Sequence, residues 1–126
     1  MTSSTTSALR VLVVDDHELT RCTLKLALEF QSHIKLVGVA SNGREAIALV
    51  QQHQPDLVVL DLHMPIMDGW KTSQEIKRKY PQIKIVAYSA ADGGKAKAQA
   101  NGAVIDAFCE KGACTKSLLE TIRKIV

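Results

Sequence analysis

The stretch LVVLD spans residues 57–61, and VLVVDD spans residues 11–16. Both apolar runs are typical of short buried strands in a parallel sheet. Because ligands of open α/β sheets bind just beyond the carboxyl ends of the strands, we expect Asp15, Asp16 and Asp61 to converge on one spot. Like charges at that distance resist full ionisation. A hard divalent cation such as Mg²⁺, which takes oxygen ligands and keeps several waters, relieves this conflict. The pattern indicates phosphoryl chemistry at a metal site.

The composition is that of one ordinary domain. The chain has 126 residues, of which 46% are hydrophobic, and a formal net charge of +3. This charge is too small to indicate nucleic-acid contact by the domain itself, and no apolar run approaches the roughly 20 residues of a membrane helix. We expect a flexible tail over residues 1–8 and one domain over residues 9–126. The three cysteines are odd in number and lack metal-ligand spacing, which indicates reduced thiols and a cytoplasmic location.

Strand and helix patterns alternate along the chain. Strands are predicted at 10–15, 35–40, 56–61, 84–89 and 107–111. Helices are predicted at 18–30, from 41–43 onward, and at 70–79, 95–100 and 115–125. This alternation predicts an α/β fold, in which a parallel sheet carries helices on both faces.

Two of these helices have informative local patterns. Asn42 and Glu45, three residues apart, predict a capping pair at the start of the second helix. In the first helix, one face at helical spacing carries Leu19, Cys22, Leu26 and Phe30.

Four segments occur in the order and positions of a bacterial response-regulator receiver domain, and they read VVDDH (13–17), LDLHMPIMDG (60–69), SA (89–90) and EK (110–111). The resemblance runs from about Arg10 to Val126. The segments NGREA (42–46) and KGA (111–113) are similar to the subgroup that precedes a LuxR/NarL-type helix-turn-helix domain. The resemblance implies a CheY-like, flavodoxin-like fold, in which a five-stranded parallel sheet of order 2-1-3-4-5 is doubly wound with five helices.

The resemblance also implies roles for individual residues at the metal site. Asp61 would be the phosphoacceptor nucleophile, and its carboxylate would form an acyl phosphate. Asp16 would ligate Mg²⁺ directly, Asp15 would contribute mainly through bound water, and His63 would offer its backbone carbonyl. The His63 side chain is expected to be a partial lid. The remaining histidines show no ligand-like spacing, so surface or packing roles are the better interpretation for His17, His33 and His53.

Further residues would act on the phosphoryl group. Lys111 would contact a phosphoryl oxygen and pair with Asp61 beforehand. The Ser89 hydroxyl and the Ala90 amide would donate hydrogen bonds to it, and Ser89 and Phe108 would form the switch. Gly112 stands where the family commonly has proline, so the isomer of the preceding peptide bond stays open.

The function implied is that of a phosphoacceptor switch in a two-component system. A sensor histidine kinase or phosphotransfer protein would supply the phosphoryl group, and the domain would assist its own phosphorylation and dephosphorylation without being an enzyme in the usual sense. The change would reach the face made by the 95–100 helix, the fifth strand and the final helix. A homodimer could form through this face or through the first and last helices, and a DNA-binding domain beyond residue 126 would control transcription. The alternatives are an interaction module that is never phosphorylated, a stand-alone regulator, or a small enzyme on a similar fold.

Overall fold

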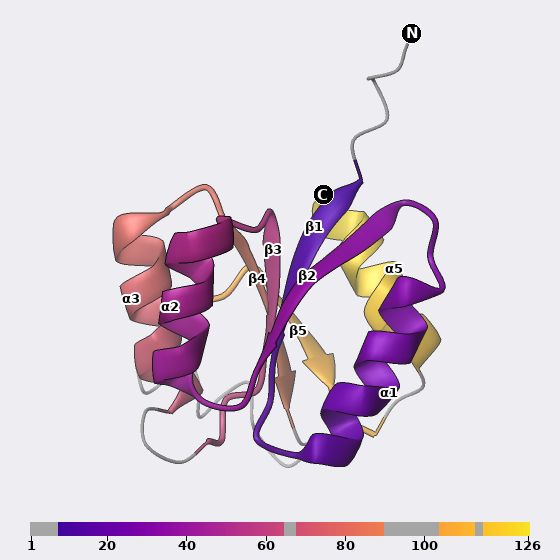
Figure 1. Ribbon diagram of the computed structural model, residues 1–126, viewed down its shortest axis with the longest axis horizontal. Coiled ribbons are helices and arrows are strands. Elements are labelled where there is room, and N and C mark those ends of the chain that lie inside the picture. Colours follow the sequence, from indigo (N-terminus) through magenta and orange to yellow (C-terminus); the bar gives the residue numbers. More distant parts are fainter. Residues whose placement is uncertain (1–7, 65–67, 90–103, 113–114) are drawn as a thin grey trace, which may run out of the picture.

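The computed structural model describes residues 8–64, 68–89, 104–112 and 115–126, and these form a sheet with helices packed on both faces (Figure 1). The strands are β1 (Leu9–Val14), β2 (Ile34–Ala40), β3 (Leu57–Leu60), β4 (Lys84–Ser89) and β5 (Ala107–Glu110). The helices are α1 (Glu18–Glu29), α2 (Gly43–His53), α3 (Gly69–Lys79) and α5 (Thr115–Ile125).

All strand pairs are parallel, and the order β2-β1-β3-β4-β5 confirms the expected sheet. The described residues contain four of the five expected helices. The fifth, expected at residues 95–100, lies outside the described residues.

Side chains of the central strands alternate between two cores. Val11 and Val13 of β1 pack with buried leucines and isoleucine of α1 and α5, whereas Leu12 and Val14 pack with residues of α2 and α3. This alternation follows from the two-residue period of a strand. Figure 1 accordingly shows α1 and α5 on one side of the sheet and α2 and α3 on the other. The sheet is therefore buried on both faces, as its continuous apolar runs predict.

The outward face of α1 corrects the simplest interpretation of its apolar pattern. Leu19, Leu26 and Phe30 are 79%, 70% and 89% exposed, and Cys22 is exposed as well. The helix instead buries Leu24 and Leu28 against the sheet. Residues two positions apart differ by about 200° around a helix, so α1 is apolar on two faces. Periodicity alone does not tell which of them meets the sheet.

The start of α2 confirms the expected capping pair. The Asn42 side chain accepts a hydrogen bond from the Glu45 backbone N–H at 2.9 Å. The Glu45 carboxylate in turn accepts one from the Ser41 N–H at 2.7 Å. These bonds satisfy amide groups that have no partner within the helix.

The register of the sheet brings the ends of its strands together. Val14 pairs with Leu60, and the Asp61 N–H donates to the Val14 carbonyl at 2.9 Å. Ser89 pairs with Glu110 at the end of β4 and β5, and the Lys111 N–H donates to the Ser89 carbonyl. Side chains that follow β1, β3 and β5 are thereby placed along one edge. Within the described residues, none of the helices is long and apolar enough to cross a membrane.

Candidate functional site

Asp61 follows β3 directly and is almost completely buried, with 2% of its surface exposed. Its Oδ1 accepts a hydrogen bond from the His63 N–H at 3.1 Å, and its Oδ2 lies 3.4 Å from the Lys111 Nζ. Burial raises the pKa of Asp61 from 3.8 to about 6. The charge of Asp15 adds to this increase, whereas the His63 N–H and Lys111 oppose it. The Asp61 carboxylate is thus poorly solvated, and a nearby cation would stabilise its ionised form.

The Asp pair after β1 lies beside Asp61. Asp15 is 1% exposed, and its Oδ1 accepts a hydrogen bond from the His17 N–H at 2.8 Å. The ligand atoms of Asp15, Asp16, His17 and Asp61 all lie within 4.8 Å of one another. The structure therefore brings together the three carboxylates that the strand ends predict. A cluster of oxygen ligands with open access through the partly exposed Asp16 fits a small divalent cation such as Mg²⁺.

Lys111 forms ion pairs with two carboxylates of this cluster. Its Nζ lies 2.7 Å from Asp15 Oδ2 in an ion pair, and 3.4 Å from Asp61 Oδ2. Burial by itself lowers the pKa of Lys111, but Asp15 and Asp61 outweigh it and raise the pKa above its ordinary value. Lys111 is therefore charged at neutral pH. The described residues contain no cis peptide bond, so the bond to Gly112, which has a φ of 100°, is trans.

Ser89 ends β4 at the same edge and is fully buried. Its hydroxyl has no hydrogen-bond partner among the described residues. A buried hydroxyl without a partner is uncommon and is suited to receive a ligand oxygen. Ala90 lies outside the described residues, so its expected amide contact is not seen. Phe108 on β5 is half-buried and packs in a small cluster with Leu62 and Ala87.

His63 extends from the site toward solvent. Its side chain is exposed, and its ring meets the ring of Trp70 edge-on, with centroids 5.2 Å apart and an angle of 89°. This contact places the His63 ring beside the first turn of α3. Its role as a partial lid over the site stays a prediction.

Two residues at the start of α1 belong to the site although the sequence analysis missed them. The Nδ1 of His17 lies 3.1 Å from Asp15 Oδ1 and 3.0 Å from Asp16 Oδ1. The Arg21 guanidinium donates to the Asp15 carbonyl at 2.8 Å. The signal available was position: His17 directly follows the acidic pair, and Arg21 lies one helical turn further on.

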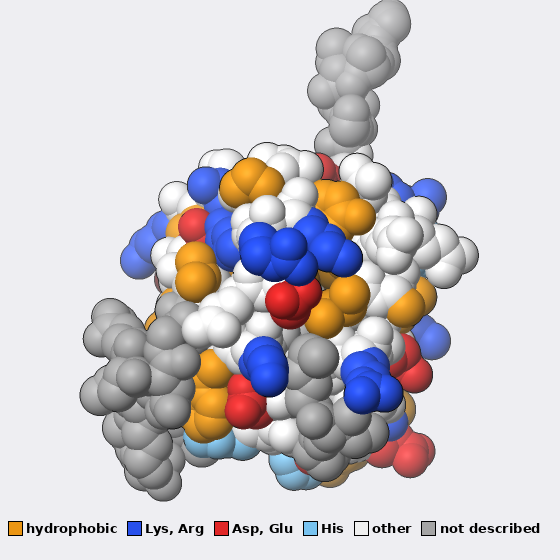
Figure 2. All heavy atoms as spheres, turned by 90° about the vertical axis from the view of Figure 1, so that its left-hand side faces the viewer, with side chains coloured by type: hydrophobic (Ala, Val, Ile, Leu, Met, Phe, Trp, Pro, Cys, Tyr) orange, Lys and Arg blue, Asp and Glu red, His pale blue; other side chains and the backbone are white. Residues whose placement is uncertain are grey.

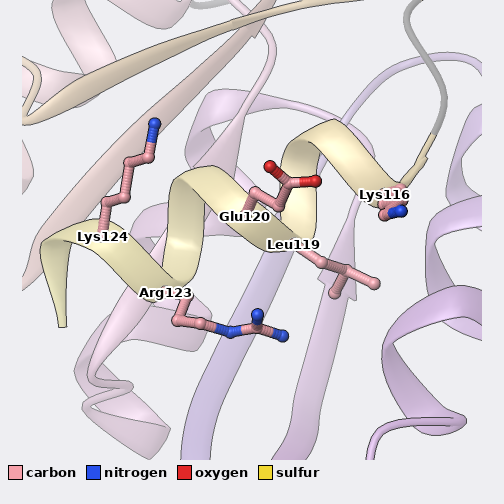
Figure 3. A pocket seen from close by; sticks show the side chains of 5 residues that line it. All are labelled: Lys116, Leu119, Glu120, Arg123 and Lys124. Atoms are coloured by element: carbon pink, nitrogen blue, oxygen red, sulfur yellow. The ribbon is translucent and has the colours of Figure 1, made fainter.

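Other surface features do not contain the expected site residues. Figure 2 shows lysine and arginine side chains gathered on the face covered by α3, whose last turn is basic. Part of this charge is paired, because Lys77 lies 2.7 Å from Asp106 and Arg78 lies 3.0 Å from Glu75. An open hollow of about 330 Å³ on α5 is lined by Lys116, Leu119, Glu120, Arg123 and Lys124 (Figure 3). The cluster at the strand ends is therefore the better candidate for chemistry.

Comparison with known proteins agrees with this site. Residues 11–123 match the model of the response regulator receiver domain. The response regulator protein VraR of Staphylococcus aureus is 36% identical over 116 residues, which are 92% of this chain and 56% of VraR. The chain thus spans about half the length of the curated relatives that it matches.

Solved structures give the same result. The receiver domain of the putative response regulator NarL from Mycobacterium tuberculosis has a TM-score of 0.81 and 29% identity, with 94% of this chain and 95% of that chain covered. A LuxR-family DNA-binding response regulator from Staphylococcus aureus has a TM-score of 0.82 and 26% identity, with 92% and 97% covered. The response regulator domain of Thermotoga maritima CheB has a TM-score of 0.79 and 31% identity, with 93% and 95% covered. The chain belongs to the response regulator receiver domain family, and its relatives support the LuxR/NarL-type subgroup.

Proposed function

We propose that Asp61 accepts a phosphoryl group from a phosphohistidine of a sensor kinase or phosphotransfer protein. An Asp61 oxygen attacks the phosphorus, the phosphorus–nitrogen bond breaks, and the leaving imidazole takes up a proton. The observation that carries this proposal is the position of Asp61, buried within reach of the Lys111 ammonium and beside two further carboxylates. Transfer of this kind needs mainly in-line positioning and neutralisation of charge. The Lys111 ammonium and a cation bound by the carboxylates would supply the neutralisation.

The carboxylates of Asp15, Asp16 and Asp61, together with the His63 carbonyl, would hold Mg²⁺. When bound, the cation neutralises charge on the carboxylates and on the incoming phosphoryl oxygens. Lys111 would bind one phosphoryl oxygen through its ammonium. The domain would in this way assist its own phosphorylation, and later the loss of the phosphoryl group to water.

Ser89 and Phe108 would convert the phosphorylated state into a change at the surface. The buried Ser89 hydroxyl and the Ala90 amide would donate to the phosphoryl group, and the half-buried Phe108 would move as Ser89 shifts. The affected face would include β5, α5 and the 95–100 segment. The kinship with LuxR-family regulators supports a cytoplasmic transcription factor whose DNA-binding domain follows residue 126. A stand-alone regulator is the alternative.

The exposed apolar face of α1 would be the surface on which the phosphodonor docks. It begins at Leu19, two residues after His17, whose ring touches the acidic cluster. Leu26 and Phe30 continue it away from the site, and both are largely exposed. A helix of the donor could cover this face while its phosphohistidine reaches Asp61. Exposed apolar area of this kind commonly marks an interface.

The test of phosphorylation uses a small donor, so that no partner protein is needed. Acetyl phosphate and Mg²⁺ should add one phosphoryl mass to the intact chain. Asp61→Asn should abolish the added mass, whereas Asp56→Asn, which changes an exposed carboxylate at the opposite end of β3, should not. Equal labelling of Asp61→Asn would show that Asp61 is not the acceptor. An unlabelled parent chain would favour the interaction module.

The docking surface is tested by comparing two donors. One donor is a phosphotransfer protein that labels the parent chain. Replacement of Leu26 and Phe30 by serine should slow transfer from this donor by more than about tenfold, because large exposed anchors dominate such interfaces. Labelling by acetyl phosphate should be unchanged. If both donors are equally affected, the face acts on folding or chemistry. If only the oligomeric state changes, a second copy of this chain is the occupant.

A further inference from the structure

The His17 side chain lies against the acidic cluster. His17 is the N-cap residue of α1, with extended φ and ψ of −92° and 118°, and its side chain makes no capping hydrogen bond. The His17 N–H instead donates to Asp15 Oδ1 at 2.8 Å. The ring itself faces the carboxylates of Asp15 and Asp16, and it remains 63% exposed. The ring is thus both reachable from solvent and adjacent to the candidate cation site.

The His17 ring contacts the cluster through one of its nitrogens, Nδ1. Nδ1 lies 3.1 Å from Asp15 Oδ1, 3.0 Å from Asp16 Oδ1 and 3.4 Å from Lys111 Nζ. In the tautomer that carries its proton on Nε2, the ring presents the Nδ1 lone pair to the space between these carboxylates. Nδ1 is thus placed to serve as an additional ligand atom beside the carboxylate oxygens.

We propose that His17 makes this site selective among divalent cations, in favour of borderline transition metals such as Ni²⁺ and Zn²⁺ over Mg²⁺. The inference rests on the proposed cation site and adds a nitrogen ligand to its oxygens. Imidazole nitrogen binds these metals well, whereas Mg²⁺ prefers oxygen ligands and water. The ligand atoms of the three aspartates and His17 already lie within 4.8 Å of one another, so a cation in the cluster would be within reach of the imidazole nitrogen.

The proposal predicts that the two classes of metal depend on different residues. Mg²⁺ would rely on the carboxylates, so removal of the imidazole should leave its affinity within about twofold. Ni²⁺ would lose a preferred ligand, so its affinity should fall about tenfold or more. Asp16 should matter to both, because its carboxylate oxygen lies beside His17 Nδ1.

The test measures binding of each metal alone by calorimetric titration of the folded protein, without a phosphodonor. The variants are His17→Ala and His17→Asn; the second keeps a residue that is favourable at a helix N-cap. All proteins carry Cys22→Ser, because an exposed thiol binds Ni²⁺ on its own. His33→Ala is the matched control, since it removes another exposed imidazole, which lies just before β2 and is not part of the cluster.

Relative to the parent, the expected result is a selective loss of Ni²⁺ affinity in both His17 variants and an unchanged Ni²⁺ affinity in His33→Ala. An unchanged Ni²⁺ affinity in the His17 variants would overturn the proposal, as would an equal loss of Mg²⁺ and Ni²⁺. Tight Ni²⁺ binding by Asp16→Asn would place the metal elsewhere and overturn it as well. Because no phosphoryl transfer is measured, failure here is distinguishable from failure of Asp61 to be labelled.

Discussion

Asp61→Asn should make the metal-free protein more stable at neutral pH. Burial raises the pKa of Asp61 from 3.8 to about 6, so the folded state holds the Asp61 proton more tightly than the unfolded state. The stability from this proton is fully present below the unfolded pKa and is lost as the pH rises through about 6. Each pH unit between the two values corresponds to about 1.4 kcal/mol, so the ionised Asp61 costs at most about 3 kcal/mol above that range.

Asparagine has nearly the same shape as aspartate but carries no charge. In the Asp61→Asn variant, Lys111 keeps its ion pair with Asp15 at 2.7 Å, so the loss of its weaker contact with Asp61 should cost little stability. We expect the free energy of unfolding to increase by about 1–3 kcal/mol at about pH 7.5 and to change little at about pH 4.

The assay is urea unfolding followed by circular dichroism in EDTA, with Asp56→Asn as the exposed control. A variant that is less stable than the parent at about pH 7.5 would refute the reasoning. A gain of the same size at both pH values would refute it too, because the gain would then come from packing rather than from charge.

Two further predictions concern the elements that position the site. Gly69→Ala should destabilise the protein by about 1–3 kcal/mol, because the new Cβ would clash with the backbone carbonyl oxygen of Asp61. Gly38→Ala, whose Cβ would meet only side-chain atoms, of Leu12 at 3.2 Å and of Leu49 at 3.5 Å, should cost less, and equal costs in urea unfolding would contradict the steric argument. Asn42→Ala should lower the free energy of unfolding by about 1 kcal/mol through loss of the cap on α2. Asn42→Asp should retain most of the parent's stability, because aspartate also caps helices. If Asn42→Ala is as stable as the parent, the cap contributes nothing to stability.

The parts of the fold that were predictable are those in which short-range chemistry and topology agree. The apolar runs at 11–14 and 57–60 are buried strands, and the aspartates that follow them converge because parallel strands end at one edge. The Asn42 cap was predictable because both partners lie within one helical turn. The pattern of motifs along the chain predicted the family.

The parts that were not predictable depend on orientation. Leu24 and Leu26 are equally apolar, and only packing against the sheet decides that the first is buried and the second is exposed. The Nδ1 of His17 faces the carboxylates of Asp15 and Asp16, and the spacing between histidines in the sequence gives no sign of these contacts. Residues that act through a neighbour's side chain are the ones that sequence patterns miss.

The ion pairs at the strand ends join parts of the chain that are far apart in sequence. Lys111 pairs with Asp15, which lies near the other end of the chain, and with Asp61, which lies 50 residues away, so the cluster closes only after long loops have closed. Because closing long loops costs entropy before the contacts can stabilise the chain, we expect this cluster to form after the folding transition state. The electrostatic cost of ionised Asp61 should therefore act mainly on the unfolding rate, with little effect on the folding rate. A cation that neutralises the cluster would then slow the unfolding of the domain without speeding its folding.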